Sequence, residues 1–145
     1  MGRKVSIVGI QNSPTKYDLE KNLKDAFGLL DEALGLYKYV DIAVFPEYFS
    51  FVPESKDTPI IEEYNEEIKK MLAMRARAYD TYIIGGTVAN KQEDGNIYNT
   101  SLVFDRNGDI IGSYDKIHLF DVLDAKSEEQ KSYQITRGDN LLTFD

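Results

Sequence analysis

The sequence predicts an α/β fold in which a β-α-β-α-β series is followed by a β-hairpin. Over residues 1–88, short β-branched segments alternate with segments whose apolar residues recur with helical spacing. A turn-prone run, Asp105-Arg106-Asn107-Gly108, then separates two further strand-like segments. Alternating strands and helices are typical of a parallel sheet with crossover helices.

The first strand, the first helix and the second strand have clear signals. Residues 5–10 are apolar and β-branched, which predicts a buried strand. A helix is expected next, because Asp18 is a suitable N-cap and apolar residues follow every three or four positions. These positions are Leu19, Leu23, Ala26, Phe27, Leu30, Ala33, Leu34 and Tyr37. Residues 41–45 predict a second buried strand, which ends at Pro46.

A second helix and a third strand complete the series. Thr58-Pro59 predicts the helix start, since threonine is a good cap and proline suits the first helical position. The inward-facing stripe is predicted at Ile61, Tyr64, Ile68, Leu72, Arg75, Ala76 and Tyr79. Residues 82–88 predict the third strand, which contains Gly85-Gly86.

The hairpin and the last segments follow. Residues 99–104 and 109–114 predict the two strands of the hairpin. Residues 123–131 are polar and predict an exposed loop or a short helix, and residues 141–144 predict the start of a further strand. Because the 145 residues contain no internal repeat and no linker, we expect one domain or part of one.

Composition and charge argue against several classes of protein. With 17 basic and 25 acidic residues the net charge is -8, so we expect no general nucleic-acid or anionic-membrane surface. No run approaches the roughly 18 apolar residues of a membrane span, and the apolar start is too short for a signal peptide, so a cytoplasmic protein is expected. The absence of cysteine excludes disulfides, thiolate metal sites and a cysteine nucleophile within these residues.

Three polar features are candidates for chemistry. Glu47 follows the second strand, where open α/β sheets form their sites, and is a candidate general base; the alternative is a solvated loop glutamate. Lys116 follows the hairpin and is a candidate for stabilising an oxyanion, with His118 expected on the same side of an extended chain. Their alternatives are a surface lysine and a packed histidine. Asn99, at the start of a strand, could equally be a turn residue that bonds its own backbone.

These motifs together resemble the N-terminal half of the nitrilase superfamily, the carbon-nitrogen hydrolases. The resemblance covers nearly all of the chain, and its motifs occur in the family's order. They are Gln11-Asn12, Phe45-Pro46-Glu47, Gly85-Gly86-Thr87, Tyr98-Asn99-Thr100, Asn107-Gly108 and Tyr114-Asp115-Lys116-Ile117-His118-Leu119-Phe120-Asp121. The last string is the most specific, and the order and spacing of Glu47 and Lys116 agree with the family's functional pair.

The resemblance implies a fold, a reaction and a set of site residues. The fold is half of an α-β-β-α sandwich, which leaves the apolar side of one sheet face uncovered. The reaction hydrolyses non-peptide C–N bonds of small amides, nitriles or carbamoyl compounds through a Glu-Lys-Cys triad and a thioester, without a metal or organic cofactor. Glu47 would be the base and Lys116 would stabilise the oxyanion. The candidate substrate-binding residues are Tyr48, Phe49, Phe51, Asn99 and His118.

The sequence departs from the family because it contains no cysteine. In relatives the cysteine lies a little beyond the position that matches Asp145, so we expect residues 1–145 to be the N-terminal portion of a single carbon-nitrogen hydrolase domain that is inactive alone. Two alternatives stay open: a pseudo-enzyme or binding module, and one chain of a two-chain enzyme. Relatives commonly pair subunits across a helical face, so a homo-oligomer is also expected. Many relatives carry a second glutamate after the lysine, to which we assign no residue.

Overall fold

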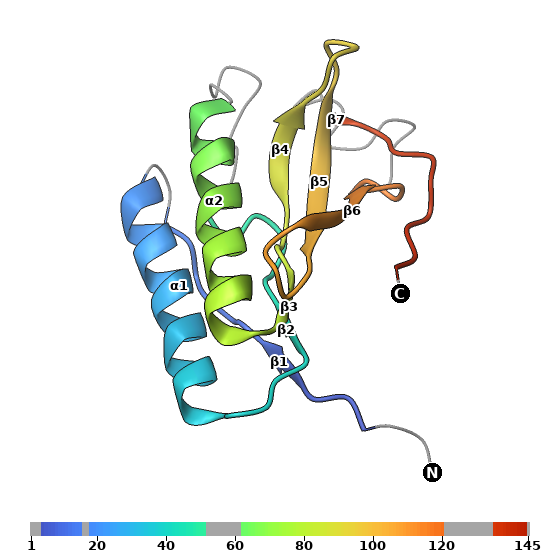
Figure 1. Cartoon of the computed structure of the whole chain (residues 1–145). Helices are drawn as coiled ribbons and strands as arrows, with labels where there is room; N and C mark the ends of the chain where they lie inside the picture. Colours follow the sequence, from blue (N-terminus) through green and yellow to red (C-terminus); the bar gives the residue numbers. More distant parts are fainter. Residues whose placement is uncertain (1–3, 16–17, 52–61, 121–134, 145) are drawn as a thin grey trace.

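The computed structural model describes residues 4–15, 18–51, 62–120 and 135–144 (Figure 1). Two helices and a mixed sheet confirm the predicted β-α-β-α-β series followed by a hairpin. The elements are β1 (Ile7–Gly9), α1 (Leu19–Leu36), β2 (Ile42–Val44), α2 (Glu62–Tyr79), β3 (Tyr82–Ile84), β4 (Val88–Lys91), β5 (Ile97–Phe104), β6 (Ile110–Asp115) and β7 (Ile135–Thr136).

The sheet is parallel where the helices cross over and antiparallel around the hairpin. β1, β2 and β3 run parallel, in that order, and β3 then pairs antiparallel with β5. β5 is the longest strand, and its registers place β3 and β4 along one edge and β6 and β7 along the other. The end of β6 therefore lies beside Thr100, near the middle of β5.

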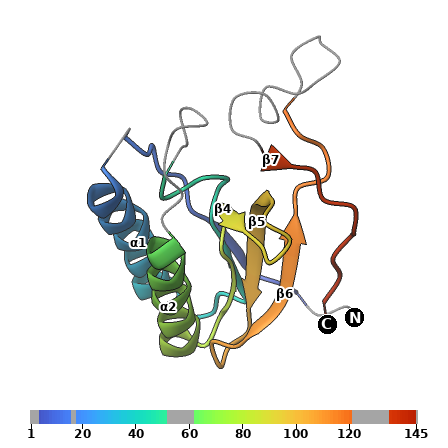
Figure 2. The same cartoon turned by 90° about the horizontal axis from the view of Figure 1, so that it is seen from above.

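Both helices cover the same face of the sheet (Figures 1 and 2). Apolar side chains are exposed on β1 and β6, including Ile7 at 63% and Ile110 at 50%. The prediction that residues 5–10 form a fully buried strand was therefore wrong for Val5 and Ile7, because the described residues supply a helical layer on only one face. This one-sided covering agrees with half of a sandwich fold.

The third predicted strand is in fact two strands. Residues 82–88 were expected to be continuous, but Gly85 and Gly86 separate β3 from β4. Gly86 has φ +61°, which lies outside extended geometry and turns the chain between the two strands. β3 and β4 then pair with different parts of β5, β3 with its end and β4 with its start.

α1 begins as the sequence predicts. The Asp18 carboxylate caps the helix by accepting a hydrogen bond from the Lys21 N–H at 3.0 Å. Its buried residues are Asn22, Leu23, Ala26, Phe27, Leu30 and Leu34. The prediction failed for Tyr37, which is 64% exposed, because the helix ends at Leu36 and the backbone becomes extended at Tyr37.

α2 buries a narrower stripe than predicted. Its buried residues are Asn65, Ile68, Leu72 and Ala76. Tyr64 and Tyr79 are exposed, which contradicts the prediction; Asn65 is buried instead, and its amide donates to the Ala89 carbonyl of β4 at 2.8 Å. The predicted helix start at Thr58-Pro59 and the stripe residue Ile61 lie outside the described residues.

The hairpin turn is stabilised by Asp105. Its carboxylate accepts hydrogen bonds from the backbone N–H groups of Asp109 and Asn107, both at 2.9 Å, and these bonds lower the pKa of Asp105 from its ordinary value. Gly108 takes φ +80° in the turn. This Asx-type geometry is the reason that the Asp105-Arg106-Asn107-Gly108 signal was reliable.

The chain after the hairpin differs from the prediction. Residues 141–144 form no strand; β7 at Ile135–Thr136 instead pairs parallel with Ile97 and Tyr98 of β5. The Leu142 side chain packs against Gly112 of β6, where a Cβ would approach Leu142 Cδ2 to 2.8 Å. The segment is thus held by side-chain packing, which a strand pattern does not distinguish from sheet pairing. The loop predicted at residues 123–131 lies outside the described residues.

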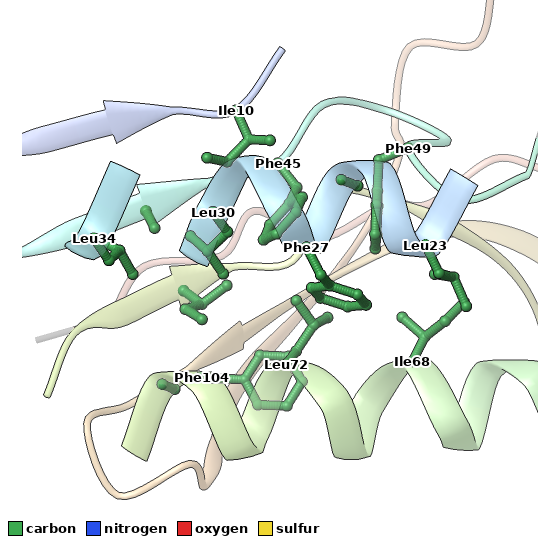
Figure 3. Packing of buried hydrophobic residues seen from close by; sticks show 14 residues of the cluster. Ile10, Leu23, Phe27, Leu30, Leu34, Phe45, Phe49, Ile68, Leu72 and Phe104 are labelled. Carbon is green, nitrogen blue, oxygen red and sulfur yellow. The ribbon is translucent and has the colours of Figure 1, made fainter. Parts of the chain in front are cut away.

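The hydrophobic core lies between the helices and the sheet (Figure 3). An aromatic group formed by Phe27, Phe45 and Phe49 is central to it, with ring centroids 4.7–6.0 Å apart. Such separations suit edge-to-face and tilted ring contacts. Phe45 and Phe49 flank Glu47 in the sequence, so the core also anchors the segment that carries this residue.

Phe27→Ala is expected to lower the free energy of unfolding by about 3–5 kcal/mol, the usual cost of removing a buried aromatic ring. Phe27 is 1% exposed and touches both other rings, and the Arg75 guanidinium lies 4.2 Å from its centroid. Urea unfolding of the 145-residue chain measures the change. Leu29→Ala, at a 39% exposed position of the same helix, is the control and should cost less than about 1 kcal/mol. Equal losses in the two variants would contradict this account of the core.

Candidate active site

Glu47 lies just beyond the carboxyl ends of the parallel strands. The backbone hydrogen bonds between the parallel strands continue briefly past β2. The Ile10 N–H donates to Val44 O at 2.8 Å, and the Phe45 N–H donates to Ile84 O at 2.9 Å. Pro46 has no N–H and cannot continue these hydrogen bonds. The chain therefore turns at Glu47, at the edge where α/β sheets place their functional side chains.

Lys116 lies immediately after β6 and is fixed by its backbone on two sides. Its N–H donates to the carbonyl of Asn99 on β5 at 2.9 Å, and its carbonyl accepts from the Gly138 N–H at 3.0 Å. A Cβ on Gly138 would collide with the Asp115 carbonyl, so this approach requires glycine. The backbone of Lys116, from which its side chain extends, is thus held between β5 and the segment after β7.

Glu47, Lys116 and Asn99 meet through one oxygen atom. Lys116 Nζ donates to Glu47 Oε1 at 2.9 Å, and Asn99 Nδ2 donates to the same Oε1 at 2.7 Å. The side chains of Glu47 and Lys116 are 51% and 23% exposed, and Asn99 is completely buried. Three residues that the sequence singled out, on three separate segments, are therefore neighbours.

The ion pair is suited to chemistry more than to stability. An exposed or half-exposed pair contributes only about 0–1 kcal/mol to folding. A carboxylate at a strand end can accept a proton, and a fixed ammonium beside it can stabilise a developing negative charge. A pair of this kind therefore offers a base and an electrostatic stabiliser side by side.

The loop after Glu47 is held by side chains from other segments. The Tyr48 N–H donates to Thr87 Oγ1 at 3.0 Å, and Asn12 Nδ2 donates to the Phe49 carbonyl at 2.8 Å. Tyr48 adopts φ +49°, a conformation that is uncommon for a residue with a side chain and that persists only where its surroundings enforce it. The backbone beside Glu47 is therefore fixed in one unusual conformation.

Asn22 of α1 completes this support. It is 1% exposed, and its amide donates to the Ser50 carbonyl at 2.9 Å and to the Thr15 carbonyl at 2.8 Å. Its Oδ1 accepts from the Thr15 N–H at 2.7 Å. Sequence analysis missed the roles of Asn22 and Thr87. The only signal for Asn22 is a polar residue inside an apolar helical stripe, whereas Thr87 does belong to a motif that the sequence analysis noted.

The three aromatic candidates occupy different environments. Phe49 is fully buried in the core, 4.7 Å from Phe45 between ring centroids. Tyr48 and Phe51 are half-buried. The structure therefore separates Phe49, which lies in the core, from the two aromatics whose surfaces are partly accessible.

His118 lies in a bend and not in the extended chain that was expected. It was expected on the same side as Lys116 of an extended chain, but β6 ends at Asp115 and the chain bends at Ile117 and His118. His118 is exposed, and the Ile117 N–H donates to the Tyr114 hydroxyl at 3.3 Å. The period-two argument was wrong here because it holds only within a strand.

The described part of the chain has neither a cluster suited to a metal ion nor a helix suited to a membrane. Among residues 4–15, 18–51, 62–120 and 135–144, no group of three histidine, cysteine, aspartate or glutamate side chains could hold a metal ion. Neither helix in these ranges has the length and apolar character needed to cross a bilayer.

Fold and site together define an α/β protein that presents a carboxylate-ammonium pair at the ends of its strands. The family model for carbon-nitrogen hydrolases matches residues 4–143, and the chain belongs to this family. Similar curated proteins include the omega-amidases NIT2-B of Xenopus laevis, 33% identical, and NIT2 of Homo sapiens, 31% identical. Each alignment covers 98% of this chain and 50% of the relative, so the chain spans about half the length of these relatives.

Solved structures agree on the fold. A carbon-nitrogen hydrolase from Helicobacter pylori G27 superposes with a TM-score of 0.76 at 22% identity, over 93% of this chain and 45% of the other. Nit3 of Saccharomyces cerevisiae, of the nitrilase superfamily, gives a TM-score of 0.73 at 21% identity, over 94% of this chain and 49% of the other. The described strands and helices thus have the arrangement of about half of a nitrilase-type chain.

Proposed function

We propose that this chain supplies the general base and the oxyanion-stabilising cation of an amidase-type carbon-nitrogen hydrolase. The observation that carries the proposal is the 2.9 Å contact between Lys116 Nζ and Glu47 Oε1 at the ends of two strands. The two residues are 69 positions apart in the sequence, so only the fold brings them together. Family membership supplies the reaction class.

The proposed reaction proceeds through a thioester. Glu47 takes the proton of a cysteine thiol, which is mostly protonated at neutral pH and needs an adjacent base. The thiolate attacks the substrate carbonyl carbon, and Lys116 stabilises the oxyanion of the tetrahedral intermediate. Collapse of this intermediate breaks the C–N bond, and the amine leaves with the proton from Glu47. Glu47 then takes a proton from water, whose oxygen attacks the thioester, and returns that proton to the sulfur as the C–S bond breaks and the acid and the thiol are released.

The nucleophile must come from outside these residues, because the sequence contains no cysteine. We propose that residues 1–145 are the N-terminal portion of a single hydrolase domain and are inactive alone. Coverage of half of each curated relative and the exposed apolar residues on β1 and β6 support this. The cysteine would lie on a continuation of the same polypeptide; a binding module without catalysis and a two-chain enzyme remain the alternatives.

The proposed substrates are small amides, nitriles or carbamoyl compounds. Similarity to omega-amidases favours amides among these three. Tyr48 follows Glu47 directly, Phe51 lies four positions after it, and both are half-buried, so they would form an apolar wall; the exposed His118, two positions after Lys116, would contact the substrate. Phe49 would contribute indirectly, through its packing in the hydrophobic core that supports this wall. We also propose that the complete protein is cytoplasmic and forms a homo-oligomer.

The coding sequence beyond Asp145 tests the domain assignment. We expect the reading frame to continue into a segment that carries a cysteine, and its complete product to release ammonia from small amides. Copurification of a second chain with the cysteine would instead identify the two-chain enzyme. A stop codon directly after Asp145, with no partner chain and a cooperatively folding product, would refute the single-chain proposal and favour the binding module.

Lys116→Met in the complete hydrolase is expected to lower kcat by about 10²–10³-fold, the usual effect of removing one oxyanion-stabilising group. Methionine retains the length of the side chain and removes the charge. Lys91→Met, at the exposed end of β4, is the matched control and should leave kcat within about twofold. Steady-state amide hydrolysis measures both variants. Retention of full kcat in the Lys116 variant would exclude the proposed role.

A further inference from the structure

Asn99 contacts both members of the proposed pair. Its side-chain amide donates to Glu47 Oε1 at 2.7 Å, and its main-chain carbonyl accepts from the Lys116 N–H at 2.9 Å. Asn99 therefore sets the distance between the Glu47 carboxylate and the backbone of Lys116. Asn99 is itself fixed within β5, where it is paired with Ala89 of β4.

Burial argues against contact between Asn99 and a substrate. The residue is 0% exposed, and its Nδ2 already donates to the carboxylate. A buried amide that a substrate cannot reach contributes through the group that it touches. The expectation that Asn99 binds substrate therefore gives way to a different role.

The hydrogen bonds to Glu47 also distinguish its two oxygens. A carboxylate oxygen has two lone pairs, and Oε1 already accepts from both Lys116 Nζ and Asn99 Nδ2. The Glu47 side chain is 51% exposed, and a glutamate of that exposure ordinarily samples several rotamers. Two donors on one oxygen fix the rotamer and leave Oε2 as the more available proton acceptor.

We infer that Asn99 is a positioning residue: with Lys116 it holds Oε1 of Glu47, so that Oε2 takes the proton of the nucleophile. The inference rests on the proposed function for its catalytic part. It gives the buried Asn99 side chain a positioning role and identifies Oε2 of Glu47 as the oxygen that accepts the proton. The proton moves from the thiol to Oε2 and later to the leaving amine, while Oε1 keeps its two hydrogen bonds throughout.

Kinetics of the complete hydrolase test this role. Asn99→Asp has nearly the same shape, but it replaces the donor with a carboxylate that repels Glu47. We expect kcat to fall about 100-fold, as for a misplaced catalytic group, with KM within about threefold. Asn90→Asp, at a half-buried position of the neighbouring strand β4, introduces the same charge and should leave both constants within about twofold. An increase in KM at unchanged kcat would show that Asn99 binds substrate and would overturn the inference.

A second variant guards against misfolding. Asn99→Ser removes the amide without introducing a buried charge, and its hydroxyl is too short to replace the contact with Oε1. If Asn99→Asp does not fold, the serine variant should show the same loss of kcat at nearly constant KM. A folded serine variant with unchanged kcat would overturn the inference.

A structural measurement on the complete protein separates this inference from the proposed function. Side-chain J couplings of Glu47, measured by NMR, should report a single χ1 rotamer in the unsubstituted protein and averaging in Asn99→Ser. Averaging in both would overturn the inference even if the complete protein proves active. A fixed rotamer that depends on Asn99 would support it even if the complete protein hydrolyses no amide, in which case only the proposed function fails.

Discussion

Glu47→Gln is expected to abolish nearly all turnover of the complete hydrolase, with a fall in kcat/KM of about 10³-fold or more. Glutamine retains the shape of the side chain, and its carbonyl oxygen can still accept from Lys116 and Asn99. It cannot take a proton from a thiol or from water, and the proposed mechanism needs a base at both steps. Amide hydrolysis under steady-state conditions measures the loss.

Two controls make the Glu47 result specific. Glu93→Gln changes the same functional group at an exposed position between β4 and β5 and should leave kcat/KM within about twofold. The free energy of unfolding of Glu47→Gln should change by less than about 1 kcal/mol, because the ion pair is half-exposed. Normal turnover by a correctly folded Glu47 variant would exclude this residue as the base.

Gly86→Ala is expected to lower the free energy of unfolding by about 3 kcal/mol, a sum of backbone strain and overpacking. Gly86 has φ +61°, and a Cβ there would collide with the Pro46 carbonyl and lie 2.8 Å from Phe49 Cδ1. Backbone atoms cannot give way as a flexible side chain can, so the segment that carries Glu47 must shift. Urea unfolding of the 145-residue chain measures the cost.

Gly95→Ala is the matched control for Gly86. Gly95 also has a positive φ, +81°, but a Cβ there would have nothing within 4 Å. Its substitution should therefore cost only the strain, about 1–2 kcal/mol. The difference between the two variants isolates the contact between Gly86 and the loop before Glu47. Equal costs would show that this contact is unimportant.

Local signals in the sequence predicted the elements that depend on local interactions. The Asp18 cap, the stripe of α1 and the turn at Asp105 each involve residues within a few positions of one another, and they were confirmed except for Tyr37 at the end of the stripe. Pairing partners depend on residues far apart in the sequence. The division of residues 82–88 into β3 and β4, and the choice of Ile135–Thr136 as a strand, therefore required the structure.

Burial was harder to predict than helix or strand type. Tyr37 and Tyr64 fit helical stripes but are exposed, because a periodic pattern does not say where the helix or the layer opposite it ends. Asn22 and Asn65 are polar and yet buried, because each satisfies its amide with backbone groups of another segment. No local pattern predicts such long-range partners.

The candidate site was partly predictable. The rule that strand ends carry functional side chains led to Glu47 and Lys116, and the structure brings them within hydrogen-bonding distance. The rule for strand alternation failed for His118, because the strand had already ended. Apolar character alone could not distinguish the buried Phe49 from the half-buried Phe51.

The central claim is that this chain holds the base and the cation of a carbon-nitrogen hydrolase but not its nucleophile. Ammonia release from small amides tests it most directly, measured for the pure 145-residue chain and for the complete protein that carries the cysteine. We expect no turnover from the chain alone, turnover from the complete protein, and loss of that turnover in Glu47→Gln. Turnover by the pure 145-residue chain, or an unchanged rate in the Glu47 variant, would contradict the claim.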